Sequence, residues 1–380
     1  MTDPNVLFSP LQIGNVTIKN RLAMAPMTRQ RSYLDGTPTD LNVEYYRQRA
    51  SSGLIITEGI FPDFMGWGYM FTPGLCTDKH MQGWKRVTDA VHAEGGHIFG
   101  QIMHVGRLSD PLILDGKQPI APSAVQPDPT ARHYTIHCPR AKRPYQEPRE
   151  MTHAEVLETI DGFKRSAVLA QQAGFDGVEI HAASGYLPHQ FLSPNSNTRE
   201  DQWGGSVEKR CAFLLACVDA MVEATSPGFV AVKFSPGWTF HDVFDDNPQA
   251  TFSYAVKELS KRGIAFLELG NYGMDWDVYG LLRQLFDGPV CFVAGFTRSR
   301  AADTIAAGAA DFIAFGQNFI SNPDLAERYQ NDWGLSPADL STYYTQGAEG
   351  YTDYPFHADC DPDMLVPVDS PPTPLMDTNK

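Results

Sequence analysis

The sequence contains no apolar run of about 18 residues, the length that a transmembrane helix needs, so no membrane span is expected. The first residues, 1–5, also lack the basic-then-apolar order of a secretory signal. Basic residues are fewer than acidic ones: the chain has 30 Lys and Arg and 45 Asp and Glu, which gives a formal net charge of -15. Such a surface repels nucleic-acid phosphates and anionic lipids. We therefore expect a cytoplasmic protein without nucleic-acid or membrane partners.

Closely spaced cysteines are absent as well. The six cysteines are Cys76, Cys138, Cys211, Cys217, Cys291 and Cys360. No pair has the close spacing of a zinc or iron–sulfur site, so no metal centre is predicted. We expect free thiols that are mostly buried, as is common for cysteines of cytosolic proteins.

Short, β-rich apolar runs alternate with longer segments of helical period. The runs are 21–26, 54–58, 97–103, 177–181, 230–234, 266–269, 290–294 and 312–315. The helical segments are about 40–52, 80–94, 152–173, 206–226, 247–262, 275–286, 298–308 and 322–331. Eight strand–helix repeats predict an α/β fold, a (β/α)8 TIM barrel in one domain over residues 1–355. A doubly wound open sheet is the rival, but the segment after the first run has Pro26 where a glycine-rich turn would be needed.

Two proline-rich segments fall outside the repeat. Residues 104–150 follow the third run and hold eight prolines between Pro111 and Pro148. In a barrel this excursion leaves from the active-site face, so we expect it to cap the site. Residues 356–380 show no helical or strand pattern, and we expect an extended, partly disordered tail.

The richest chemistry follows the fourth run, where His181, Ser184 and Tyr186 lie within six residues. A ring N–H, a hydroxyl and a phenol can together hold a carbonyl oxygen and protonate a neighbouring carbon. Taken alone, the same residues could equally close a barrel loop. Lys233 lies near the end of the fifth run, where burial of an ammonium is costly unless it meets an anion.

Glycines mark the loops after the seventh and eighth runs, at Gly295 and Gly316. In barrels this pair of loops often binds phosphate through backbone N–H groups. A phosphate there, with polar groups over the middle of the mouth, favours a mononucleotide such as FMN.

The chain resembles the Old Yellow Enzyme family of FMN-dependent ene-reductases almost from end to end. The matching segments are 7–10, 19–21, 24–29, 44–46 with 49–51, 53–59, Trp84 with 91–96, 101–107, 121–123, 173–186, 190–192 with 196–197, 204–206, 322–325 and 349–355. Only 124–148 and the tail lack clear counterparts. The resemblance implies non-covalent FMN, with NADPH or NADH as the reductant.

The resemblance also implies the residues that hold FMN. They are Pro26, Met27, Thr28, Gly59, Gln101, His181 and Lys233 at the flavin ring, and Gly295, Phe296, Gly316 and Gln317 at the phosphate. Lys233 and Gln317 both stand where the family usually has Arg. Lys233 cannot make the bidentate contact of an Arg, and Gln317 cannot make a charge-assisted hydrogen bond to the phosphate. Arg298 or Arg300 is a candidate to replace the second.

For the substrate, the resemblance implies His181 as the oxygen anchor and Tyr186 as the proton donor. The second anchor is usually Asn or His, but Ser184 stands there, so the oxygen is held by His181 alone or through a water. Tyr69, Met103 and Tyr344 match the pocket walls. Together with Thr28 near the reactive edge of the flavin, His181, Ser184 and Tyr186 form the predicted catalytic set.

The predicted reaction is the reduction of a small-molecule activated alkene. NAD(P)H reduces FMN, hydride passes from flavin N5 to the β-carbon of an α,β-unsaturated carbonyl or nitroalkene, and Tyr186 protonates the α-carbon. One alternative is a family relative that acts on nitrate esters, nitroaromatics or a specialised natural-product enone. Another is a non-redox barrel, either a Lys233 Schiff-base lyase or a flavin-binding sensor. The protein is expected to be a monomer or a homodimer.

Overall fold

The computed structural model describes residues 4–128, 134–135, 141–142, 144–239 and 241–371. The expectation of disorder at the very end of the tail concerns residues 372–380, which lie outside this set. Within the described residues, no helix combines the length and the apolar character needed to cross a membrane.

Eight parallel strands close into a barrel, in the order β3-β4-β5-β10-β11-β12-β13-β14, with β14 paired to β3. The strands are β3 (Leu22–Met24), β4 (Leu54–Ile56), β5 (Ile98–Ile102), β10 (Gly177–His181), β11 (Val230–Phe234), β12 (Leu267–Gly270), β13 (Val290–Val293) and β14 (Phe312–Phe315). Seven lie within the predicted runs, and β12 extends one residue beyond its run, to Gly270. The (β/α)8 fold is confirmed, and the doubly wound rival is excluded.

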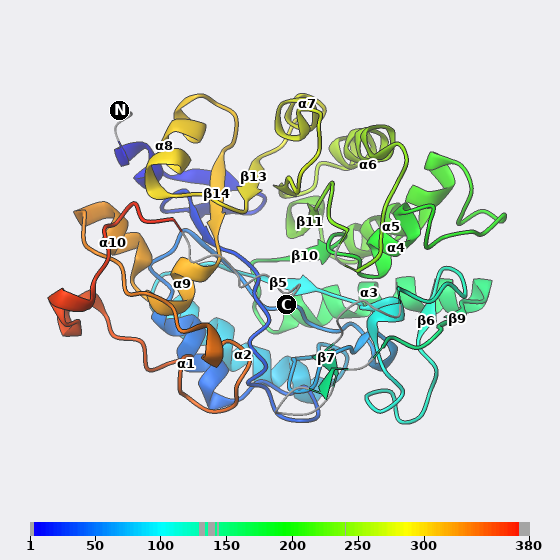
Figure 1. The fold of residues 1–380 in the computed structure, drawn as a ribbon, viewed down its shortest axis with the longest axis horizontal. Coiled ribbons are helices and arrows are strands. Elements are labelled where there is room, and N and C mark those ends of the chain that lie inside the picture. Colours follow the sequence, from blue (N-terminus) through cyan, green and yellow to red (C-terminus); the bar gives the residue numbers. More distant parts are fainter. Residues whose placement is uncertain (1–3, 129–133, 136–140, 143, 240, 372–380) are drawn as a thin grey trace.

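Helices surround the strands (Figure 1). They are α1 (Asp40–Gln48), α2 (Asp78–Ala93), α3 (His153–Gln172), α5 (Val207–Ala224), α6 (Pro248–Arg262), α7 (Val278–Gln284), α8 (Arg298–Ala306) and α10 (Leu325–Asn331). Two short helices, α4 (Leu187–Leu192) and α9 (Gln317–Ser321), follow β10 and β14 and were not predicted. Both begin at the mouth, so they orient residues close to the site.

Caps fix where the longer helices begin. A capping box begins α3, because the Thr152 hydroxyl accepts from the Glu155 N–H and the Glu155 carboxylate accepts from the Thr152 N–H. At α6, the Asn247 side chain accepts from the Ala250 N–H and Pro248 is the first helical residue. These caps anchor the two helices on either side of α5.

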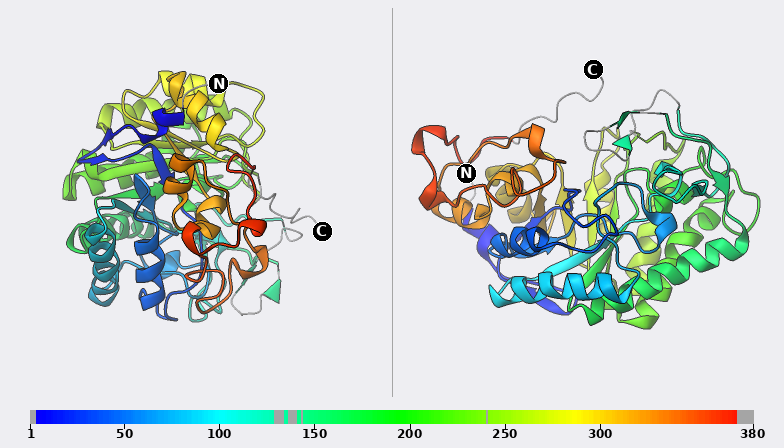
Figure 2. Two further views of the ribbon diagram at one scale, coloured as in Figure 1. Left: turned by 90° about the vertical axis from the view of Figure 1, so that its left-hand side faces the viewer. Right: turned by 90° about the horizontal axis from the view of Figure 1, so that it is seen from below.

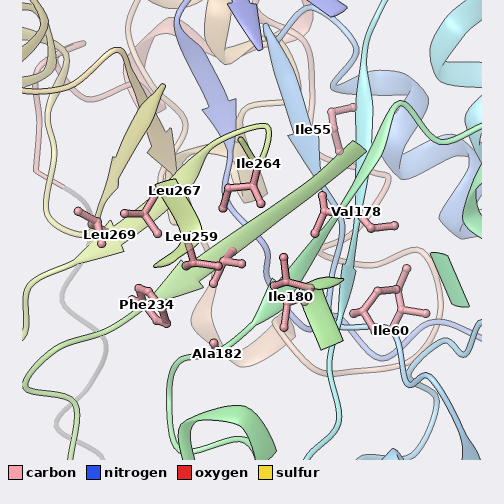
Figure 3. Packing of buried hydrophobic residues seen from close by; sticks show 14 of the residues in the cluster. Ile55, Ile60, Val178, Ile180, Ala182, Phe234, Leu259, Ile264, Leu267 and Leu269 are labelled. Carbon is pink, nitrogen blue, oxygen red and sulfur yellow. The ribbon is translucent and has the colours of Figure 1, made fainter. Parts of the chain in front are cut away.

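Alternate residues of each strand face opposite sides of the barrel wall. Val178, Ile180 and Leu267 point outward and pack with residues such as Leu259 of α6 in one large buried cluster (Figure 3). Phe99, Ala231 and other residues of the opposite face form a second cluster inside the barrel. The strand positions between the outward residues, including Glu179 and His181, are therefore directed into the barrel.

An N-terminal hairpin packs against this inner cluster. Its strands are β1 (Leu11–Ile13) and β2 (Val16–Ile18), and Ile13 and Ile18 are buried with the inner residues. The turn needs Gly14, which has φ +50 and on which a Cβ would lie 2.0 Å from the Gly228 carbonyl oxygen. The sequence analysis did not identify this hairpin.

The excursion after β5 carries a 3-10 turn (Gly106–Leu108) and the strands β6 (Ile120–Ala121), β7 (Tyr134–Thr135), β8 (Ala141–Lys142) and β9 (Arg149–Glu150). β6 pairs with β9, and β7 pairs with β8. The buried guanidinium of Arg107 donates to the carbonyl oxygens of His241 (3.2 Å) and Asp242 (2.5 Å) in the loop after β11. The start of the excursion is thus hydrogen-bonded to the loop after β11, and its role as a cap over the site stays a prediction.

The C-terminal segment lies along one side of the barrel, next to α10 (Figures 1 and 2). It contains two short 3-10 turns, His357–Asp359 and Pro362–Met364, where no regular structure was expected. Val366 pairs with Leu335 in an isolated antiparallel bridge. Asp369 accepts hydrogen bonds from the N–H (2.8 Å) and the hydroxyl (2.5 Å) of Ser299 in the first turn of α8. Residues 366–371 therefore run from the loop after α10 to the loop after β13.

Candidate active site

Three of the predicted site residues lie on adjacent strands and meet at the carboxyl end of the barrel. Gln101 of β5 is in register with Glu179 of β10, and His181 of β10 is in register with Lys233 of β11. Lys233 is in turn in register with Glu268 of β12. All five side chains are buried. A row of polar side chains therefore lies across the mouth of the barrel on this side. The strand register determines which of them are neighbours.

Two hydrogen bonds connect this row. Gln101 Nε2 donates to Glu179 Oε1 (2.8 Å), and Lys233 Nζ donates to Glu268 Oε1 (2.5 Å). Burial, reinforced by the nearby Glu268 carboxylate, raises the pKa of Glu179 well above its usual value. Burial lowers the pKa of Lys233, but the carboxylates of Glu268 and Glu179 outweigh it and the net pKa is raised. The row therefore holds an ion pair between Lys233 and Glu268 and, beside it, a carboxyl group whose protonated form burial favours.

His181 presents a neutral imidazole at this mouth. Burial, together with the Lys233 ammonium, lowers its pKa well below the usual value. Its ring stands edge-on to the Tyr186 ring, with centroids 4.7 Å apart. Among the described residues, no group is hydrogen-bonded to His181 Nδ1, although this atom is buried. A buried ring nitrogen without a partner is suited to a ligand atom.

Tyr186 lies at the start of α4, and its hydroxyl is 3.1 Å from the Tyr69 hydroxyl. Burial, followed by the influence of Tyr69, raises the pKa of Tyr186 well above its usual value, so the phenol keeps its proton. Tyr186 packs in a small apolar cluster with Met103, Tyr145 and the half-buried Tyr69. The structure thus unites Tyr186 with two of the three predicted wall residues.

The third wall residue, Tyr344, is less enclosed. Its side chain is 37% exposed, and its ring stands edge-on to Tyr343 at 6.3 Å. It contributes to the raised pKa of both Tyr69 and Tyr186, which places it within electrostatic range of their hydroxyls. Tyr344 therefore lies at the rim of the pocket rather than in its packed wall.

Ser184 is held by its backbone rather than by its hydroxyl. It has φ 55, in the left-handed region that non-glycine residues seldom occupy. Its N–H donates to Ser235 Oγ (2.8 Å), and its carbonyl oxygen accepts from His241 Nδ1 (2.5 Å). Both partners come from the segment after β11. The serine is therefore fixed in place with its side chain short of the position that an Asn side chain would reach.

His241 is a site residue that the sequence analysis missed. Its ring packs against Tyr186 with centroids 5.7 Å apart, and burial lowers its pKa to about 4. Because Nδ1 must donate to the Ser184 carbonyl, the neutral ring carries its proton on Nδ1. The only sequence signal was a histidine in a polar loop after a strand that already carries Lys233.

The ring-wall residues predicted after β3 and β4 also converge. Pro26, Met27 and Thr28 are half-buried in the segment that leaves β3. A Cβ on Gly59 would lie 2.5 Å from Met103 Sδ, so this position has no room for a side chain. A Cβ on Gly316 would have Met27 Sδ as its nearest neighbour, at 3.5 Å. The segment after the second barrel strand therefore adjoins the end of the third, and the segment after the first adjoins the end of the eighth.

The predicted phosphate loops lie at the exposed edge of the mouth. Ala294 and Gly295 have φ 80 and 72, and among the described residues no hydrogen bond uses the N–H of Gly295 or Phe296 as donor. Arg300 Nη1 donates to the Gly295 carbonyl (2.9 Å), and its guanidinium lies 4.6 Å over the Phe296 ring. Arg298 instead pairs with Asp332 (2.6 Å). Of the two candidate arginines, Arg300 is the one beside this loop.

These features fit a flavin mononucleotide. The buried row offers hydrogen-bonding groups for a polar ring edge, His181 offers an unpartnered nitrogen, and the glycine loops offer free backbone N–H groups. The chain matches the NADH:flavin oxidoreductase / NADH oxidase family over residues 6–335. It belongs to the Old Yellow Enzyme family.

Individual relatives agree with this assignment. The chain is 38% identical over 361 residues to a probable flavin mononucleotide-dependent alkene reductase of Leishmania infantum, with 93% of this chain and 98% of that protein covered. The old yellow enzyme homologue of Zymomonas mobilis superposes with a TM-score of 0.89 at 37% identity, covering 92% of this chain and 99% of that one. Morphinone reductase in complex with tetrahydroNAD gives a TM-score of 0.88 at 40% identity, covering 92% and 97%.

Members of the Old Yellow Enzyme family depend on FMN and take their electrons from NAD(P)H. The chain is accordingly an NAD(P)H-dependent FMN oxidoreductase of the ene-reductase type, as the sequence predicted. The roles of its individual residues, its substrate and its assembly are the subject of the proposals below.

Proposed function

We propose that the enzyme reduces the C=C bond of an α,β-unsaturated carbonyl or nitroalkene, with His181 as the oxygen anchor and Tyr186 as the proton donor. One observation carries the proposal. An unpartnered, buried imidazole nitrogen lies beside a phenol that keeps its proton, with the two rings 4.7 Å apart. An anchor and an acid at this separation suit two neighbouring positions of one conjugated substrate.

Each residue then has a distinct task. The neutral His181 ring donates a hydrogen bond to the substrate oxygen and stabilises the negative charge that develops there. FMN, when bound, would supply the hydride for the β-carbon, with NAD(P)H as its source. Tyr186 donates the proton to the α-carbon, and the Tyr69 hydroxyl at 3.1 Å can return a proton to it. Met103 and Tyr69 exclude water around the phenol, and Tyr344 borders the entrance.

FMN itself would be held from both ends. The residues that would line the ring are Pro26, Met27, Thr28, Gly59, Gln101 and Lys233. The phosphate would lie against Gly295, Phe296, Gly316 and Gln317. Because Gln317 carries no charge, we assign the positive charge near the phosphate to Arg300, which already lies on the Gly295 loop. Arg298 is occupied by Asp332.

The visible spectrum of the purified protein, followed by anaerobic titration with NADPH and with NADH, tests the proposal. We expect a yellow protein that bleaches on titration and recovers its colour on addition of an enone. A protein that stays colourless with added FMN would refute cofactor binding. A protein that bleaches but never recovers with enones or nitroalkenes would refute the substrate class.

A second candidate is a relative that reduces nitrate esters, nitroaromatics or a specialised natural-product enone. It is favoured by Ser184, whose side chain cannot reach as far as an Asn, so the anchor region has room for a differently shaped acceptor. A substrate panel scored by the rate of flavin reoxidation separates the two candidates. The Schiff-base alternative is disfavoured, because the ion pair with Glu268 keeps Lys233 protonated. A cytoplasmic location and a monomeric or homodimeric state stay predictions, which fractionation and light scattering can test.

A further inference from the structure

The lysine at the flavin edge already has a counter-ion within the protein. Lys233 Nζ and Glu268 Oε1 are 2.5 Å apart, on residues that face each other across β11 and β12. The Lys233 side chain is buried and the Glu268 side chain is fully enclosed. Since the two are neighbours by strand register, the pair is built into the barrel and does not depend on a mobile loop.

A second carboxyl group lies beside the pair, on the next strand. Glu179 lies one strand away, accepts from Gln101 Nε2 (2.8 Å) and is fully buried. Burial, with the help of Glu268, raises its pKa well above the usual value, which favours the protonated form. Glu179 Oε2 and Glu268 Oε2 are both buried without a partner among the described residues. The carboxylate that contacts the Lys233 ammonium directly is therefore that of Glu268.

We propose that Glu268 is a positioning residue that neutralises Lys233 and thereby weakens the preference of the site for reduced over oxidised FMN. A cation beside the ring edge stabilises the negative charge that FMN gains on reduction, and a carboxylate within 2.5 Å of that cation offsets it. The inference rests on the proposed function, because it takes Lys233 to lie at the ring edge of bound FMN.

Glu268→Gln tests this inference, because it removes the negative charge and preserves the shape. We expect the ratio of the Kd for oxidised FMN to the Kd for reduced FMN to rise by at least about tenfold. For a two-electron couple, a tenfold change is a shift in midpoint potential of about 30 mV, here toward more positive values. Anaerobic redox titration against a reference dye measures the shift without substrate turnover.

Glu179→Gln is the matched control, because it alters the carboxyl group of the same row that is bonded to Gln101 rather than to Lys233, and burial favours its neutral form. We expect it to leave the midpoint potential unchanged. The double variant Glu179→Gln/Glu268→Gln prevents Glu179 from ionising in place of Glu268 and should shift at least as far as Glu268→Gln. If Glu268→Gln does not fold, Glu268→Asp, which lengthens the contact with Lys233, should give a smaller shift of the same sign.

Equal shifts in Glu179→Gln and Glu268→Gln would overturn the inference, as would a double variant with the potential of the wild type. The failure of the proposed function has a different signature. It would be seen in the wild type, as protein that neither binds FMN nor is reduced by NAD(P)H, before any variant is made.

Discussion

The two ends of the proposed FMN site hold their polar groups in opposite ways. At the ring end, Gln101 and Lys233 are buried and already bonded to carboxyl groups of neighbouring strands. At the phosphate end, Gly295 and Arg300 are exposed, and the loop offers mainly backbone N–H groups. A buried charge must be balanced within the fold, whereas an exposed site can exchange one donor for another or for water. An uncharged Gln317 can therefore stand in place of an Arg at the phosphate end. At the ring end, the buried Lys233 needs the counter-ion that Glu268 provides.

The largest effect is expected where the ring end meets the substrate. Tyr186→Phe removes the proton donor and should slow the reoxidation of reduced enzyme by enones by roughly 10²–10⁴-fold. Reduction by NAD(P)H should change little, because the phenol takes no part in it. Stopped-flow absorbance measures both steps. Tyr145→Phe, in the same apolar cluster, is the control, and equal slowing of the two half-reactions in Tyr186→Phe would contradict the assigned role.

The next effect concerns stability at the ring end. Lys233→Met leaves the Glu268 carboxylate buried without its counter-ion and should lower the free energy of unfolding by about 3–5 kcal/mol. Chemical denaturation measures the loss. The double variant Lys233→Met/Glu268→Leu should recover most of it, since no buried charge remains. A double variant as unstable as the single one would show that the pair is not the source of the effect.

A lower pH should reduce the stability of the protein through His241. Burial lowers the pKa of His241 to about 4, against about 6.5 in the unfolded chain. Its contribution to stability is complete above pH 6.5 and is lost as the pH falls toward 4, because the unfolded chain binds a proton that the native state excludes. The free energy of unfolding should fall by roughly 3 kcal/mol over this interval.

Unfolding curves in urea between pH 4 and 7 measure this slope. His241→Asn should flatten it in part, because His189, whose pKa burial lowers to about 3, contributes a slope of the same sign. An unchanged slope in His241→Asn would place the acid sensitivity elsewhere.

The smallest effect is expected at the phosphate end. Arg300→Gln removes an exposed cation, whose contribution solvent screens, so FMN should bind only about three- to tenfold more weakly. Fluorescence titration of the apoprotein with FMN measures the change. Arg298→Gln is the control, because that guanidinium is paired with Asp332. A larger loss in Arg298→Gln than in Arg300→Gln would reverse our assignment of the phosphate cation.

The barrel could be predicted because each of its strands is a short apolar run between helices with clear period and caps. The β1–β2 hairpin escaped notice because its three-residue strands show too little alternation for a pattern. The helices α4 and α9, of six and five residues, are too short for a helical period to emerge. Length, rather than composition, limited the prediction of these elements.

The site could be predicted where a motif names the residue, as for His181 and Tyr186. Glu179 and Glu268 were missed because an acid in an apolar strand has meaning only once the strand register shows what faces it. His241 was missed for a similar reason, since its contact with Ser184 joins segments 57 residues apart. The sequence predicted which reactive side chains are present. The strand register shows which charged side chains lie beside them.

The attachment of Asp369 to Ser299 has a practical consequence for anyone who prepares this enzyme. This contact lies in the first turn of α8, directly after the loop that we propose binds the phosphate. Protein that a protease has cleaved ahead of Asp369 would keep every barrel strand but lose the hydrogen bonds between Asp369 and Ser299. Batches that differ only in clipping could then differ in yellow colour at equal protein concentration. The intact mass of each preparation should accompany its flavin content.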